Sequence, residues 1–242
     1  MISEWTRIQF PDVPEARLRE LQETKLLFLG LERHEVEFGH NVELFDTVSV
    51  NVRELNERET GLIKAGPRAS PNYWADFWHF NAERSKLTTW RLTAARGAVL
   101  SVFNFRMTLT YVQRNISTIP ELAIPAAIQT ITELSCQFDA DFPSFVRSRL
   151  RHAATHSAEY AHAERWKHAM DGPYEADQIR VAEGAKGTFI QDAIVNQTYA
   201  TADKGKMLSC EISLATKEKL QRIRRAVFGL FGPLQPDPTQ RD

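Results

Sequence analysis

The longest helical pattern in the sequence runs from Ser70 to about Asn115, and it favours a mainly α-helical fold. Ser70 suits the position that caps a helix, and Pro71 suits the first turn, where its missing N–H would have no partner. Apolar residues then recur at helical spacing, with a candidate break near residues 85–89. These residues are Trp90, Ala94, Ala98, Val102, Phe105 and Leu109. The pattern predicts a long central helix.

Weaker helical patterns precede this stretch. A helix over residues 14–38 can carry Leu18, Leu21, Phe28 and Leu29 on one side. Gly30 weakens it by about 1 kcal/mol relative to alanine unless another element packs closely there. Residues 42–55 mix β-branched and charged side chains, and we assign them as helical from their neighbours rather than from propensity. Two glycines and a proline in residues 60–69 predict the clearest boundary of the first half.

Two more helices are predicted before residue 170. Residues 126–138 carry Ile128, Ile131, Leu134 and Phe138 on one side. Residues 142–170 read as a single helix, with Pro143 in its first turn and a stop near Gly172-Pro173. Its core-facing residues are spaced three, four or seven apart: Phe142, Val146, Leu150, Ala153, Ala154 and Ala161.

Glycines and β-branched residues follow Met170 and predict a small β-meander. The predicted strands cover residues 179–182, 188–195, 197–202 and 206–212. Asp203-Lys204-Gly205 predicts a hairpin turn, because glycine readily takes positive φ. Ser213 then caps a last helix, in which Leu220, Ile223, Val227 and Leu230 form one stripe.

Four parts make up the predicted organisation of the chain. An N-terminal helical extension covers residues 1–69, and a helical core covers residues 70–170. The meander and its helix cover residues 171–231 and pack on the core, and residues 232–242 form a flexible tail. The predicted fold class is mainly α, with a small C-terminal antiparallel sheet.

The charge balance excludes a protein that is basic all over, because the formal net charge is −1. Any contact with nucleic acid must therefore come from local patches. One candidate patch covers residues 147–167. A second, residues 217–225, has five basic residues and one acid, and we interpret it as a solvated helix face.

Cysteine content and hydropathy predict the compartment. Only Cys136 and Cys210 are present, far apart, so neither a disulfide framework nor a cysteine-rich zinc site is indicated. The N-terminus lacks a charged and then apolar leader, and no run of about 18 apolar residues is long enough to span a membrane. We expect a cytoplasmic protein without membrane contact. The glycine-rich motifs that bind nucleotides are also missing.

Residues 142–170 concentrate the chemistry of the chain. They contain four of the seven histidines and five basic residues against two acids. The cluster R151-H-A-A-T-H156 resembles the R-x4-6-H signature of the HEPN superfamily, the higher eukaryote and prokaryote nucleotide-binding domains. In that family the residue after the arginine is usually Asn, Asp or His, and here it is His152. The resemblance implies a HEPN-like helical bundle.

The resemblance to HEPN ribonucleases implies that this chain cleaves RNA without a metal ion, at a site shared by two protomers. The ribose 2′-OH attacks the adjacent phosphate and leaves a 2′,3′-cyclic phosphate. By this likeness His156 is the general acid/base and Arg151 binds the scissile phosphate. No cofactor is implied. The remaining candidates are His152, Glu159 and Tyr160 as supporting residues and Arg147 and Arg149 as nucleic-acid-binding residues.

Helix geometry favours a homodimer for this chemistry. Five residues along an ideal helix turn by about 500°, so Arg151 and His156 point about 140° apart. Long side chains, a local distortion or a second protomer must bring them to one phosphate. We favour the second protomer and expect residues 147–162 near the two-fold axis. By association only, the family link suggests a role in defence or a toxin–antitoxin system, with an antitoxin or another protein as partner.

Metal binding is a competing interpretation. His152, His156, Glu159 and His162 lie at helical spacing near one face, and zinc accepts such ligands. The H-E-x-x-H pattern is absent, however, and no second helix offers a matching pair. His34, His40 and His79 are possible remote ligands without supporting spacing.

A third interpretation is a helical homodimer that catalyses nothing and binds RNA, a nucleotide or a protein partner. Its histidines would be interface residues. The aromatic residues at 73–80 suit either stacking on bases or a place in the core or dimer interface, and we favour the second. They are Tyr73, Trp74, Phe77, Trp78 and Phe80.

Overall fold

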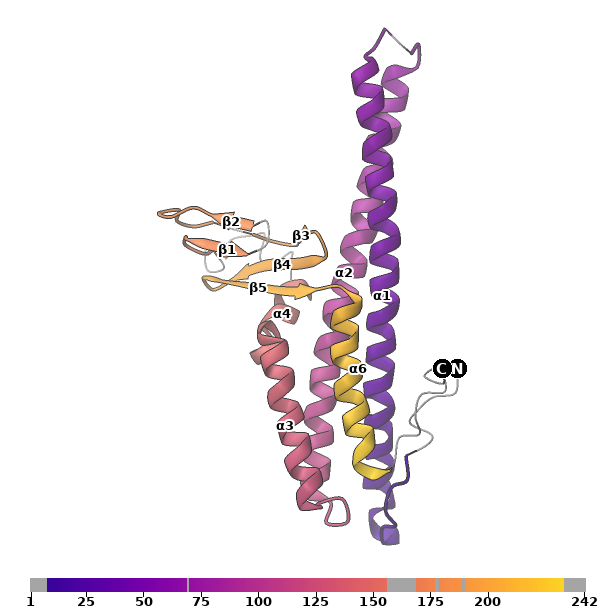
Figure 1. Ribbon diagram of the computed structural model, residues 1–242, viewed down its shortest axis with the longest axis vertical. Helices are drawn as coiled ribbons and strands as arrows, with labels where there is room; N and C mark the ends of the chain where they lie inside the picture. Colours follow the sequence, from indigo (N-terminus) through magenta and orange to yellow (C-terminus); the bar gives the residue numbers. More distant parts are fainter. Residues whose placement is uncertain (1–7, 69, 156–168, 177–178, 189, 233–242) are drawn as a thin grey trace, which may run out of the picture.

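A hairpin of two long helices forms the axis of the molecule (Figure 1). The computed structural model describes residues 8–68, 70–155, 169–176, 179–188 and 190–232. After the short 3-10 helix η2 (Glu15–Arg17), α1 spans Leu18–Ala65 and α2 spans Tyr73–Thr118. They contain 48 and 46 residues, so each is about 70 Å long at 1.5 Å per residue. Gly66 ends α1 with a φ of 77°, which glycine adopts without steric cost.

The two helices pack along a continuous apolar seam. Buried residues of this seam include Phe28, Leu31, Phe38, Val42 and Phe45 of α1 and Ala94, Ala98, Val102, Phe105 and Leu109 of α2. The predicted long central helix is confirmed, and it continues through residues 85–89 without the candidate break. The helical assignment of residues 42–55 is also confirmed, because α1 carries them into the same seam.

Glycines allow the hairpin helices to approach closely at two levels. A Cβ atom added to Gly30 would lie 3.3 Å from Cγ2 of Thr108 in α2. A Cβ added to Gly97 would collide with the side chain of Asn41 in α1. The low helix propensity of these glycines is therefore offset by interhelical packing.

The predicted single helix from Pro143 to Met170 is wrong in its described parts. After α3 (Pro125–Asp141), the 3-10 helix η3 covers Pro143–Ser148, and α4 covers Arg149–Thr155. Residues 156–168 lie outside the described residues. Met170 pairs with Thr188 in an antiparallel bridge, so this end of the segment belongs to the β region.

The side chains around η3 follow from its three residues per turn. Phe142 and Phe145, three residues apart, both point into the core. Val146, which an α-helix would bury, is instead 40% exposed. Leu150 and Ala154 are buried in α4 as predicted.

Two antiparallel sheets follow. The strands are β1 (Tyr174–Ala176), β2 (Ile179–Val181), β3 (Ala193–Val195), β4 (Thr198–Asp203) and β5 (Lys206–Glu211). Strands β1 and β2 form a hairpin, and the other sheet has the order β3-β4-β5. The sequence pattern does not predict β1. Of the described residues in the predicted strand 188–195, residues 193–195 pair in a ladder and Thr188 forms an isolated bridge. The predicted turn is confirmed, with φ values of 48° at Lys204 and 73° at Gly205.

The last helix returns to the hairpin. Helix α6 spans Leu214–Phe228 and is followed by the 3-10 helix η5 (Gly229–Phe231). Ser213 caps α6 as predicted, because its Oγ accepts from the N–H of Thr216 at 3.2 Å. The interpretation of residues 217–225 as a solvated face is wrong for Arg224, which is buried against Glu35 of α1.

The observed fold is mainly α-helical, as predicted, with a small three-stranded antiparallel sheet and a C-terminal helix. The sheet lies beside the hairpin at about its middle, above α3 and α4 in Figure 1. None of the helices in the described part of the chain is long and apolar enough to cross a membrane.

Candidate functional site

The first candidate site is the exposed side of α4. Leu150 and Ala154 are one helical turn apart and bury this helix against the core. Arg151, His152 and Thr155 therefore lie on its solvent side, where all three are exposed. The packing of α4 against α2, β4 and β5 fixes this orientation.

Arg151 is held by an aromatic ring rather than by an acid. Its guanidinium carbon lies 5.0 Å from the ring centroid of Phe103 in α2. Such a cation–π contact orients a guanidinium and leaves its N–H groups available. No ion pair links Arg151 to a carboxylate among residues that the structure describes, so these donors can meet a phosphate.

The other residues predicted for this site are only partly covered by the structure. Arg147 belongs to η3, and Arg149 is the first residue of α4. His156, Glu159 and Tyr160 lie outside the described residues. The structure thus brings Arg151 and His152 to one exposed helical turn, while the pairing of Arg151 with His156 stays a prediction.

The metal interpretation gains no support from the described histidines. His34 contacts Glu37 on its own helix, with 3.0 Å between Nδ1 and Oε2. His79 pairs with Glu83 in the same local way. No group of three metal-ligating side chains occurs within the ranges described. Three of the four clustered candidates, His156, Glu159 and His162, lie outside those ranges.

The aromatic group at the start of α2 divides into two sets. Tyr73 and Phe80 are buried, as the core interpretation predicts. Trp74 and Trp78 are 61% and 66% exposed, next to the half-buried Phe77. They lie near the end of the hairpin, about 25 residues of helix away from Phe103, which corresponds to about 38 Å. These tryptophans therefore do not belong to the α4 site.

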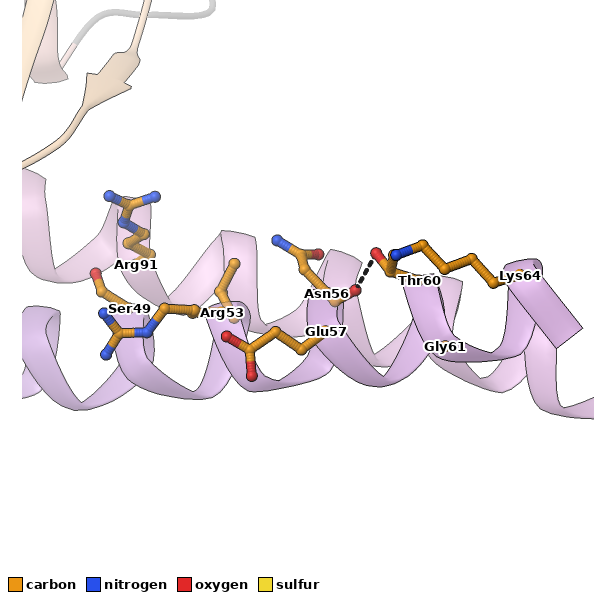
Figure 2. A pocket seen from close by; sticks show the side chains of 9 residues that line it. Ser49, Arg53, Asn56, Glu57, Thr60, Gly61, Lys64 and Arg91 are labelled. Atoms are coloured by element: carbon orange, nitrogen blue, oxygen red, sulfur yellow. Dashed lines mark hydrogen bonds between the residues drawn. The ribbon is translucent and has the colours of Figure 1, made fainter.

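A second candidate site is a groove beside α1 that the sequence analysis missed. It has a volume of about 590 Å³, within the usual range for ligand sites. Its lining residues are Ser49, Val52, Arg53, Asn56, Glu57, Thr60, Gly61 and Lys64 of α1 and Arg91 of α2 (Figure 2). We call it the α1 groove. Counted from Ser49, the α1 residues lie at offsets of 0, 3, 4, 7, 8, 11, 12 and 15, which is one helical face. This signal becomes readable only once α1 is known to be continuous.

Arg91 is the cation of the α1 groove that the fold holds most firmly. Its Nη2 donates to the carbonyl oxygen of Asn196 at 2.7 Å, and its guanidinium carbon lies 4.9 Å from the ring centroid of Phe45. Partial burial lowers the pKa of Arg91 from its ordinary value. The Nε of Arg91 and the Oγ of Ser49 are buried, and neither has a hydrogen-bond partner in the described part of the chain.

No family model matches the chain, and neither a curated protein nor a solved structure matches it.

Proposed function

We propose that this protein is a HEPN-like helical bundle that cleaves RNA without a metal ion, acting as a homodimer through Arg151 and His156. The observation that supports this most directly is the state of Arg151. Its guanidinium is exposed on α4, oriented by Phe103, and has no carboxylate partner among the described residues. A fixed, unneutralised guanidinium at the first position of an R-x4-H pattern suits a phosphate.

The proposed chemistry needs a base, an acid and a charge stabiliser. A neutral imidazole removes the proton from the ribose 2′-OH, whose oxygen attacks the adjacent phosphorus. The bond from phosphorus to the 5′-oxygen breaks, an imidazolium protonates that oxygen, and a 2′,3′-cyclic phosphate remains. Imidazole ordinarily titrates near pH 6.5, about neutral, so both forms are accessible. Arg151 stabilises the charge that builds up on the phosphoryl oxygens.

A homodimer supplies two imidazoles for these two roles. Within one ideal helix, Arg151 and His156 diverge by about 140°. In a symmetric dimer, His156 of each copy can act at a site that the two copies share. We therefore expect sedimentation to detect a dimer at about 10 µM, a concentration at which ordinary specific interfaces are occupied.

The decisive experiment incubates single-stranded RNA with wild type, Arg151→Ala and His156→Ala in EDTA. Wild type is expected to produce 2′,3′-cyclic phosphate ends. Each variant should be slower by about 10²–10⁴, the usual effect of removing a catalytic acid or base. Arg19→Ala is a suitable control, because Arg19 is an exposed arginine of α1 whose one ion pair within the described ranges is with Glu23, one turn away. Cleavage that persists unchanged in both site variants would refute the proposal.

A non-catalytic homodimer that binds RNA, a nucleotide or a protein such as an antitoxin is the second candidate. The exposed Trp74 and Trp78 favour it, because large exposed aromatics are enriched at interfaces. Replacing both with serine should weaken such an assembly without altering the buried Tyr73 and Phe80. A nuclease that remains active and dimeric in this double variant would show that the tryptophans are not needed for the dimer.

A further inference from the structure

The α1 groove contains basic side chains that are not paired with carboxylates in the described part of the chain. Arg53 and Lys64 are exposed and have no ion pair with a carboxylate in the described ranges. Arg91 also has no carboxylate partner there, since its contacts are the Asn196 carbonyl and the Phe45 ring. Among the described residues that line the groove, Glu57 is the one acid. Three cations and one carboxylate therefore line the described groove, and Asp46 lies in the adjoining hollow, so the net positive charge favours an anion.

Two buried polar atoms of the groove residues lack a partner among the residues that the structure describes. They are the Oγ of Ser49 and the Nε of Arg91, and neither makes a hydrogen bond there. Leaving such a group unsatisfied costs about 1–3 kcal/mol. Both residues line the α1 groove, although these two atoms are themselves enclosed in its wall. Both groups are hydrogen-bond donors, so a side-chain rotation toward the groove would offer them to an acceptor oxygen.

The positive end of the α1 groove is built from two helices and a turn. In Figure 2, Ser49, Arg53 and Arg91 lie at one end, and Lys64 lies at the other. A smaller hollow lined by Asn196 and Gln197 of the β3–β4 turn shares Ser49 and Arg53. The Gln197 amide donates to Asp46 of α1 at 3.2 Å, so this turn is fastened to the hairpin. The anion would meet prearranged donors.

We propose that the α1 groove binds a phosphate-bearing ligand, a nucleotide or a nucleic-acid backbone, separately from the site on α4. Arg53 and Arg91 would hold the phosphate, with Ser49 as a further donor. Phosphate fits better than a carboxylate, because its oxygens can accept from all three side chains at once. Beyond this end, Asn56 and Thr60 lie along the groove (Figure 2), and Glu57 can accept from a hydroxyl or amino group of the ligand.

The spacing along α1 allows either ligand source. Ser49 and Lys64 are separated by 15 positions, or about 22 Å of helix. A nucleotide would use the Arg53 end alone, whereas a polynucleotide would extend to Lys64. The proposal does not depend on nuclease activity, because Arg151 does not line the groove.

The test measures binding of three probes to the full chain: inorganic pyrophosphate, ADP, and a labelled single-stranded 2′-O-methyl RNA. The modified RNA has no free 2′-OH, so it cannot be cleaved by the chemistry proposed for α4. Calorimetry serves for the first two probes and fluorescence anisotropy for the third. Binding of ADP that is unaffected by Lys64→Glu identifies a nucleotide site, and RNA binding that this change weakens identifies a backbone site.

Arg53→Glu is the informative variant, because Arg53 is exposed and its replacement should leave the fold intact. We expect it to weaken binding at least about tenfold, the lower range for a hydrogen bond to a charged group. Arg58→Glu is the matched control, since it reverses an exposed charge on the same helix outside the groove, over the ring of Phe80. Arg58→Glu and Arg151→Ala should each change binding less than about threefold.

Three outcomes would overturn the proposal. The first is no binding of any probe to wild type at about 1 mM, the weakest affinity of interest. The second is equal loss in Arg53→Glu and Arg58→Glu, which indicates nonspecific charge attraction. The third is loss of all binding in Arg151→Ala, which assigns the ligand to α4. Nuclease activity lost in Arg151→Ala while ADP binding persists would separate the two sites.

Discussion

Replacing either member of the buried pair Glu35–Arg224 should destabilise the protein strongly. The Nε of Arg224 donates to Oε2 of Glu35 at 2.7 Å, and the two side chains are 4% and 5% exposed. They link α1 to α6 across 189 positions of sequence. The guanidinium also lies over the ring of Phe228, 5.1 Å from its centroid. Water therefore cannot replace a missing partner without opening the interface between the helices.

The size of the loss in the free energy of unfolding follows from the charge that stays buried after its partner is removed. Opposite charges about 4 Å apart attract by about 4 kcal/mol at an effective dielectric constant of 20. The cost of removing both ions from water is comparable, so the intact pair contributes little net stability. In Glu35→Gln or Arg224→Met the other ion keeps its desolvation cost and loses this hydrogen-bonded counter-charge. Each single variant should therefore lose about 3–5 kcal/mol.

Urea unfolding followed by circular dichroism measures this loss. Arg33→Gln is the matched control, because Arg33 pairs with Glu37 at 2.8 Å on the solvent side of α1, and such pairs contribute about 0.3–0.5 kcal/mol. A double variant, Glu35→Leu with Arg224→Met, should recover much of the stability lost in the single variants. Single variants within about 1 kcal/mol of wild type, with unchanged denaturant slopes, would refute the reasoning.

Two smaller predictions use matched pairs within the chain. Gly61→Ala should raise the free energy of unfolding by about 0.5–1 kcal/mol, because an added Cβ meets nothing within 4 Å on α1. Gly97→Ala should lower the free energy of unfolding by about 1–3 kcal/mol, because the added Cβ collides with Asn41. Urea unfolding measures both changes, and equal effects of the two substitutions would contradict the prediction. Iodoacetamide at about pH 8 should modify the exposed Cys136 and spare Cys210, whose pKa burial raises to about 12 and whose thiol therefore stays protonated. Intact-mass spectra should show one adduct on native protein and two in denaturant, and two adducts on native protein would contradict the burial of Cys210.

The helical part of the fold is readable from the sequence where apolar spacing is sustained. The stretch Ser70–Asn115 predicts α2 to within a few residues. The secondary structure of residues 42–55 is harder to predict from the sequence, because their β-branched residues favour strands. They are helical because Val42, Phe45 and Val48 repeat at three-residue spacing and meet α2 on one side. Tertiary packing therefore overrides local propensity in this segment.

The segment after α3 shows where apolar spacing misleads. Phe142, Val146 and Leu150 are each four residues apart, which is the α-helical signal. The chain instead leaves Val146 exposed and buries Phe145, three residues after Phe142. Phe145 meets Phe142 edge-on, and Phe142 lies tilted against Phe138. Both patterns are present in the sequence, and the 3-10 turn selects the one that fills the core. Choosing between them requires knowing where α3 ends.

The candidate sites differ in how much of each the sequence predicts. Arg151 lies within a recognisable local motif, and its exposure follows from the burial of Leu150 and Ala154 on either side of the same turn. The α1 groove depends on Arg91, which comes from α2 and is positioned by Asn196 of the β3–β4 turn. Arg91 and Asn196 are 105 positions apart in the sequence, so no local pattern relates them.

Helix α2 is the common support of both proposed sites, and this determines which variants can separate them. Its Phe103 orients Arg151, and its Arg91 closes the α1 groove. Between them, Arg96 binds Asp192, which also accepts from the Tyr199 hydroxyl at 2.6 Å and so ties the sheet to α2. Burial, and then the bond to Asp192, raises the pKa of Tyr199, so its phenol remains a donor at neutral pH. Because changes in this stretch of α2 can move the sheet and thereby affect both sites, only substitutions outside α2, on α1 and on α4, separate the phosphate-binding groove from the nuclease motif.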